Sequence, residues 1–230
     1  MVVAELEVHL SRPIAPTRRV ALGDRTLPVD PAPGFGGVLL GGVVARFAPE
    51  LDPEYLPEIV SLASELEAGR RVPQPRLRHR FQQDKVGLLR SVHRLLDDGD
   101  ELRFDFDDKG TPAQHVLCAV YAAGALPYRS RRRVMDSVRT GLAWRGSLDD
   151  QLVRALSGSV HAAALGDPVG WAMEVLDLRR EPEDDQPTRQ KVQQAFREGL
   201  RLAHPDHGGE TDEAAQRIAR LTEARRILLG

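Results

Sequence analysis

Hydrophobic and polar residues alternate near the start of the chain, from Val3 to Leu10. A two-residue period is the pattern of a β-strand with one buried face, so we predict a strand there. A second alternating region, Arg18 to Val29, is interrupted by Gly23 and Asp24 and predicts a β-hairpin. After a stretch rich in proline and glycine, the apolar run from Val38 to Phe47 predicts a further strand.

Apolar residues at three- and four-residue spacing, the pattern of an amphipathic helix, recur over much of the chain after residue 53. Residues 113–126 are apolar nearly all round, so we expect this helix, which Pro112 opens, to lie at the centre of its domain. Residues 101–107 alternate again and predict a strand. The other predicted helices are 53–69, 81–96, 131–143 and 148–165. Because strands come first and helices later, the fold class predicted for residues 1–165 is an α+β domain.

The last part of the chain has a different pattern. Thr188 begins a helix with one apolar face, and this helix ends at His204 and Pro205. Proline has no amide hydrogen and moves the preceding residue out of the α region, so the chain must leave the helix axis there. A second helix with apolar residues on one face follows, from Asp212 to Leu228. The pattern predicts an antiparallel helical hairpin with His204-Pro205-Asp206 at its bend.

This arrangement resembles the J-domain, the signature of the DnaJ co-chaperone family. The tripeptide His-Pro-Asp alone is weak support, but here it lies between a basic helix and a helix containing Glu-Ala. The resemblance covers about a quarter of the chain and implies a small all-α J-domain over residues 167–230, with a short first helix before the hairpin. The matching segments are Trp171–Leu178, Lys191–Phe196, His204–Gly209 and Leu221–Leu228.

The resemblance implies a function. In the family, the loop docks on a DnaK-type seventy-kilodalton chaperone and promotes its ATP hydrolysis. Asp206 would pair with an arginine of that partner, while His204 and Pro205 would shape and present the loop. The sequence thus predicts a co-chaperone whose residues 1–165 select the client or the location. No motif specifies the client.

The helix before the loop carries a local excess of positive charge. Residues 187–203 hold four cations and one anion, a net charge of +3, between acidic flanks. Such a basic segment can steer a negatively charged partner. The predicted partner-contacting cations are Arg189, Lys191, Arg197 and Arg201.

Some residues depart from the family pattern. Gln193 and Glu198 stand where the family usually has basic residues. Gly199 and Arg225 also replace the usual residues, and a glycine inside a helix costs about 1 kcal/mol relative to alanine. These substitutions leave an alternative open: a divergent J-like protein that has lost chaperone stimulation and serves as a protein or nucleic-acid binding adaptor.

Composition limits the other function classes. With 32 Lys and Arg against 34 Asp and Glu, the chain of 230 residues lacks the basic excess of a general nucleic-acid coat. The single cysteine, Cys118, excludes an internal disulfide framework and multi-cysteine metal sites, which fits the reducing cytoplasm. No segment has the length and hydrophobicity of a membrane span or signal peptide, so we predict a cytoplasmic protein without membrane contact.

Several further residues suggest chemistry, but a structural role explains each of them better. His93, His115 and His161 have no recognisable serine or cysteine partner, and Cys118 lies in the most apolar helix. We therefore predict no enzymatic activity, no cofactor and no metal site. An arginine run, with Tyr128 and Trp144 beside it, has nucleic-acid contact as its alternative, although most such runs are solvated helix faces. Its members are Arg129, Arg131, Arg132, Arg133, Arg139 and Arg145.

Overall fold

The computed structural model of the protein divides into two compact units, residues 1–158 and residues 159–230. The predicted domain boundary, at residues 166–167, lies outside the part of the chain that the structure describes. We describe each unit by itself. The described residues are 1–12, 18–72, 76–99, 101–157, 168–178, 187–203 and 211–229.

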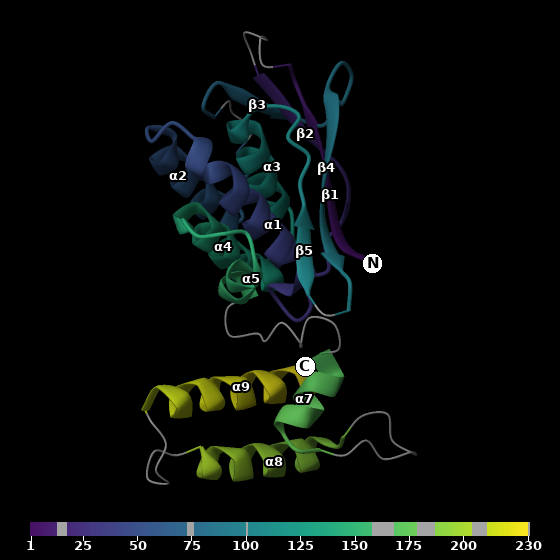
Figure 1. Cartoon of the computed structure of the whole chain (residues 1–230), viewed down its shortest axis with the longest axis vertical. Coiled ribbons are helices and arrows are strands. Elements are labelled where there is room, and N and C mark those ends of the chain that lie inside the picture. Colours follow the sequence, from purple (N-terminus) through teal and green to yellow (C-terminus); the bar gives the residue numbers. More distant parts are fainter. Residues whose placement is uncertain are drawn as a thin grey trace. The chain divides into compact units, whose positions relative to one another are not determined.

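The N-terminal unit is built on a five-stranded mixed sheet in the order β3-β2-β1-β4-β5 (Figure 1). Only the β2–β3 pair is parallel among the strand pairs of the described residues. The central strand β1 confirms the prediction for residues 3–10, since Ala4, Leu6, Val8 and Leu10 are all fully buried at alternate positions. The strands are β1 (Val2–Leu10), β2 (Arg18–Thr26), β3 (His79–Gln82), β4 (Leu89–Asp97) and β5 (Leu102–Asp105).

The helices of this unit cover one face of the sheet (Figure 1). Helices α1 and α3 pack against the strands, while α4 packs on both of them. The predicted helices at 53–69, 113–126 and 131–143 are confirmed as α2, α3 and α4. The bounds are α1 (Gly34–Phe47), the 3-10 helix η1 (Ala48–Glu50), α2 (Tyr55–Glu67), α3 (Pro112–Gly124), α4 (Tyr128–Ala143) and α5 (Asp150–Ser157).

Helix α1 corrects the prediction of a strand over residues 38–47. Its middle, from Gly36 to Ala45, is buried throughout. A helix that is enclosed on all sides needs apolar or small residues at every position, so its sequence shows no helical period. A short apolar run without a period does not distinguish a buried strand from a buried helix.

Two further predictions are wrong in the same unit. The predicted helix at 81–96 is replaced by β3 and β4, because the inward-facing residues of β4 include the polar Ser91 and His93, which hide the alternation. The predicted hairpin at 18–29 is one continuous strand, β2, which runs through Gly23. Gly23 leaves room for the side chain of Glu7 on the neighbouring strand, since a Cβ there would lie 2.3 Å from its Oε1.

Helices α1 and α4 approach each other closely at two glycines. A Cβ on Gly141 would lie 2.3 Å from the carbonyl oxygen of Gly41 and 3.1 Å from the amide nitrogen of Ala45. Both obstacles are backbone atoms, which cannot move aside as a side chain can. The absence of a side chain at Gly141 therefore sets the distance between these two helices.

The C-terminal unit contains three described helices, α7 (Pro168–Val175), α8 (Arg189–Leu202) and α9 (Thr211–Leu229). Both α7 and α8 pack against α9. None of the helices in the described part of the chain is long and apolar enough to cross a membrane.

The predicted fold class is wrong. Sheet strands and helices interleave along the first unit, which makes the chain α/β with a five-stranded mixed sheet, followed by helices, instead of α+β. The error follows from assigning α1 as a strand and β4 as a helix. A J-domain hairpin is not shown either, since its bend, at residues 204–210, lies outside the described residues.

Candidate functional site

Helix α8 carries the cationic residues that the sequence singles out. The helix begins at Thr188 as predicted, and the hydroxyl of Thr188 caps the first turn by accepting a hydrogen bond from the amide of Lys191 at 3.4 Å. The last turn closes where the amide of Ala203 donates to the carbonyl of Gly199 at 2.9 Å. Val192, on the apolar face, is fully buried. The helix thus begins at its cap and ends just before Pro205 in the sequence.

Two residues that depart from the family pattern hold α8 against α9. A Cβ on Gly199 would lie 2.6 Å from Cδ2 of Leu221, so the glycine allows the two helices to approach closely. The guanidinium of Arg225 lies over the ring of Phe196, 4.8 Å from its centroid. This geometry is a cation–π contact. The helix propensity lost at Gly199 is therefore accompanied by close packing between the helices.

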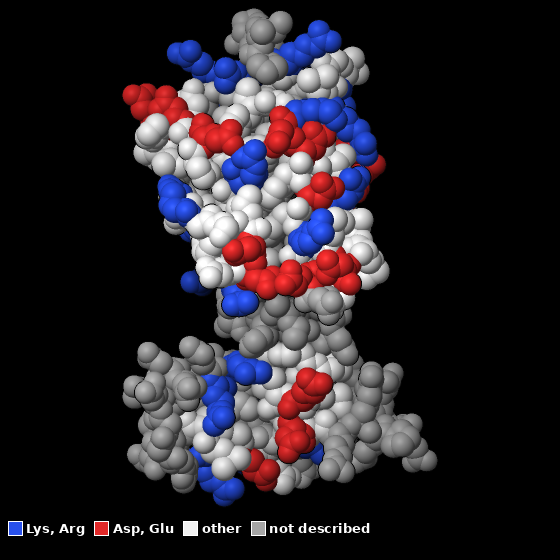
Figure 2. Space-filling view, in the orientation of Figure 1, with Lys and Arg blue, Asp and Glu red and all other residues white. Residues whose placement is uncertain are grey.

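All four predicted cations of α8 are exposed. Arg197 and Arg201 project about opposite to the buried Val192, because residues five and nine positions along a helix lie on its far side. The Nε of Arg197 donates to the carbonyl of Gln193 at 3.2 Å, which keeps this side chain along its own helix. Figure 2 shows blue cationic and red acidic side chains together on one face of this unit. The remaining cations, Arg189 and Lys191, lie in the first turn.

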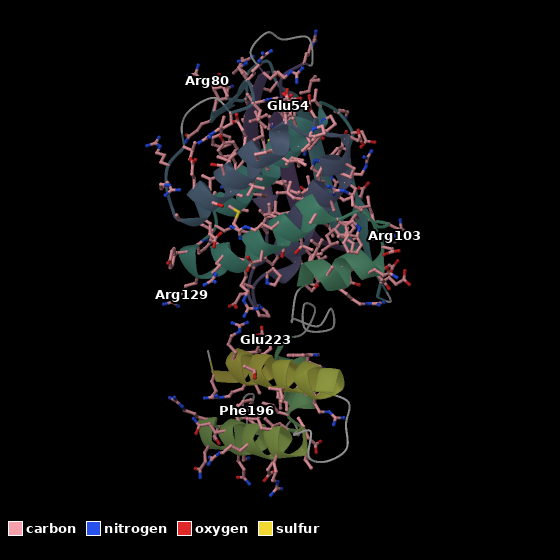
Figure 3. The ribbon with its side chains drawn as sticks, turned by 90° about the vertical axis from the view of Figure 1, so that its left-hand side faces the viewer. Glu54, Arg80, Arg103, Arg129, Phe196 and Glu223 are labelled. Atoms are coloured by element: carbon pink, nitrogen blue, oxygen red, sulfur yellow. The ribbon has the colours of Figure 1, made fainter. Side chains whose placement is uncertain are left out.

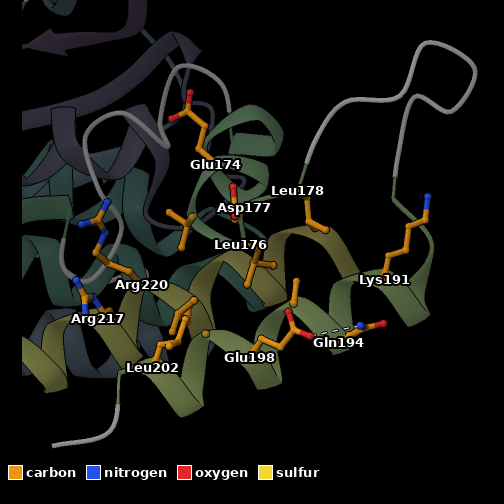
Figure 4. A pocket seen from close by; sticks show the side chains of 14 residues that line it. Glu174, Leu176, Asp177, Leu178, Lys191, Gln194, Glu198, Leu202, Arg217 and Arg220 are labelled. Carbon is orange, nitrogen blue, oxygen red and sulfur yellow. Dashed lines mark hydrogen bonds between the residues drawn. The ribbon is translucent and has the colours of Figure 1, made fainter. Parts of the chain in front are cut away.

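A groove of about 860 Å³ lies between α7, α8 and α9 (Figure 4). The buried Leu176 and Leu221 contribute apolar surface to it. Along α8, the amide of Gln194 donates to the carboxylate of Glu198 at 3.3 Å. Acids and cations therefore both border this groove. The charged residues that line it are Glu174, Asp177, Lys191, Glu198, Arg217 and Arg220.

The structure places part of the predicted partner-binding set. Arg189, Lys191, Arg197 and Arg201 share one helix, and Lys191 alone of these four lines the groove. The three residues His204, Pro205 and Asp206 lie outside the described residues.

A buried histidine pair in the N-terminal unit was missed at the sequence level. His93 Nε2 and His115 Nδ1 are 3.0 Å apart, and both residues are almost fully buried. The ring of Phe47 stacks on His115 with centroids 4.1 Å apart. Burial lowers the pKa of His93 to about 3 and that of His115 to about 4, so both imidazoles are neutral at pH 7. The alternation of β4 would have signalled the inward position of His93 if that segment had been assigned as a strand.

The thiol of Cys118 in this unit is held in an unreactive state. Cys118 is fully buried, and burial raises the pKa of its thiol. A thiol of raised pKa carries little thiolate, which is the nucleophilic form. Within the described ranges, no three His, Cys, Asp or Glu residues come together as a group that could hold a metal ion.

Comparison with known proteins adds no relative. No protein family, curated protein or solved structure matches the chain.

Proposed function

We propose that this protein is a co-chaperone of the DnaJ type, which docks on a DnaK-type chaperone and stimulates its ATP hydrolysis. The observation that carries the proposal is the sequence His204-Pro205-Asp206 between the cationic helix α8 and the helix α9. The capped start of α8 and its exposed cations support it. The proposed activity places the protein in the cytoplasm.

Each part of the segment has a proposed role. Arg197 and Arg201, on the side of α8 away from its buried face, would attract an acidic surface of the chaperone. Asp206 would pair with an arginine of the chaperone, and His204 and Pro205 would present it. The N-terminal unit would select the client or the location.

A single-turnover ATPase assay tests the proposal. A DnaK-type chaperone loaded with ATP should hydrolyse it faster with the wild-type protein than without it. The variant His204→Gln should lose this stimulation, and its circular dichroism should remain that of the wild type. The matched control is His207→Gln, a histidine of the same segment outside the tripeptide, which should retain stimulation.

The opposite result would be equal stimulation by wild type and His204→Gln, which would refute the proposed role of the tripeptide. If neither protein stimulates the chaperone, the co-chaperone proposal fails and the adaptor alternative replaces it. That alternative is consistent with Gln193 and Glu198, which lower the positive charge of α8.

A further inference from the structure

The first two turns of α4 carry an exposed cationic face with a tyrosine beside it. Tyr128 is 79% exposed, and Arg129, Arg132 and Arg133 are exposed as well. Residues three and four positions apart lie on the same side of a helix, so these four side chains share one surface. We call these four residues the arginine face.

The structure separates this face from the rest of the arginine run. Arg131, Arg139 and Arg145 all donate hydrogen bonds to other groups of the N-terminal unit. Their acceptors are the carbonyls of Leu66, Leu126, Leu142 and Trp144 and the carboxylates of Glu67 and Asp136. In contrast, no residue in the described part of the chain pairs with the side chains of Arg129, Arg132 or Arg133.

The position of these arginines is electrostatically unfavourable for the helix. The N-terminus of a helix carries the positive end of its dipole, where acids stabilise and cations destabilise. The first turn of α4 has no acidic residue. Three cations at this end, without a partner among the described residues, therefore raise the local positive potential, and a bound anion would lower it.

A second element adds positive charge beside the same helix. Arg70 and Arg71 are exposed in the loop after α2. This loop lies against α4, because a Cβ on Gly69 would be 3.2 Å from the guanidinium of Arg131. Glu67 and Asp136, two acids of this region, are both paired with Arg139.

We infer that the arginine face binds single-stranded nucleic acid. Guanidinium groups match the geometry of phosphate oxygens and pair with them in a bidentate manner. An exposed aromatic ring stacks on an unpaired base, a contact that a duplex does not offer because its bases are already stacked. The arginines and Tyr128 together therefore favour a single strand over a duplex or an acidic protein. This inference concerns the N-terminal unit and does not rest on the co-chaperone activity.

Fluorescence anisotropy with the full chain tests the inference. The probe is a labelled oligothymidylate of about 16 nucleotides, the upper end of the range for one binding domain. We expect the triple variant Arg129→Ala, Arg132→Ala and Arg133→Ala to bind at least about tenfold more weakly than wild type. Because each phosphate contact on a single strand contributes about 0.7 to the slope of log affinity against log salt, that slope should fall in magnitude by about 2.

The matched control removes the same charge elsewhere on the unit. The triple variant Arg25→Ala, Arg80→Ala and Arg103→Ala changes three exposed arginines of the sheet. Figure 3 shows Arg80 and Arg103 well separated from Arg129. The control should bind the probe within about twofold of wild type, because salt screens the electrostatic potential of distant charges within about one Debye length.

Variants of Tyr128 test the stacking contact. Tyr128→Ala should weaken binding at least about fivefold, whereas Tyr128→Phe should retain it, because the ring remains. Absence of binding by wild type, or equal losses in the two arginine triple variants, would overturn the inference. Equal or tighter binding of a DNA duplex, or of polyglutamate of matched charge, would also overturn it and assign the face to those ligands.

Discussion

The pair formed by His93 and His115 is a single hydrogen bond between two neutral imidazoles in the core of the N-terminal unit. One ring must donate and the other accept, so protonation of the acceptor removes the bond and buries a charge. The rings of Phe47 and Phe106 surround the pair and offer no polar group. Asp107 and Asp108 favour the charged forms, but burial outweighs their effect.

This pair predicts that the unit loses stability on mild acidification. The folded pKa values of about 3 for His93 and about 4 for His115 lie below the ordinary 6.5, so the unfolded chain binds more protons between these values. The stability that depends on the neutral histidines is then fully present above pH 6.5 and is lost as the pH drops below that value. We expect a loss of roughly 1–2 kcal/mol per histidine by about pH 5, measured by urea unfolding.

A double variant isolates the contribution of the pair. Replacing both partners with His93→Leu and His115→Leu leaves neither imidazole unpaired. Its free energy of unfolding should vary less between about pH 7 and pH 5 than that of wild type. An unchanged pH dependence would assign the acid sensitivity to other groups, among which His79 also has a pKa lowered by burial.

At the scale of elements, the contact of α1 with α4 through Gly41 and Gly141 predicts an unusual response to alanine. Gly141→Ala adds about 1 kcal/mol of helix propensity, but its Cβ would meet the carbonyl of Gly41. Overpacking of this kind costs about 1–3 kcal/mol, so we expect a net loss of stability. Thermal unfolding of Gly141→Ala, with Thr140→Ala on the same helix as control, measures the effect. An increase in melting temperature for Gly141→Ala would mean that the helices separate at little cost.

Individual elements also show which parts of the fold can be predicted from the sequence. Strand β1 was predictable because each inward residue, from Ala4 to Leu10, is apolar and its neighbours are mostly polar. Helix α1 was not, because burial on all sides removes its period. Strand β4 was not predictable, because the polar His93 occupies its buried face. The hydrogen-bond partner of His93 is His115, which lies on another element.

The candidate site divides in the same way. The start of α8 at Thr188 and its end before Pro205 follow from local backbone chemistry, which sequence contains. The close approach of Gly199 to Leu221 and the contact of Arg225 with Phe196 depend on the neighbouring helix. In a single sequence, Gly199 and Arg225 stand out only as departures from a family pattern, and their contacts with the neighbouring helix are not visible.

At the scale of the whole molecule, the net charge of −2 conceals local excesses of opposite sign. Reversal of two cations of α8, Arg197→Glu and Arg201→Glu, changes the charge of residues 187–203 from +3 to −1. If the proposed docking on a chaperone uses this helix, the association rate should fall, most strongly at low salt. Stopped-flow measurements should show no such fall for Arg70→Glu and Arg71→Glu, which carry the same reversal in the other unit. Equal rates for all three proteins would exclude α8 as the docking helix.

The place of β1 in the middle of the sheet has a consequence for biosynthesis. Val2 pairs with Leu96, so β1 leaves the ribosome well before β4, the strand that covers its second edge. At about 5–20 residues per second, this delay lasts roughly 5–20 s. During that time one edge of β1 stays open, and α3, which also packs on β1, is synthesised later still. The open edge of β1 can therefore pair with other strands until β4 has emerged.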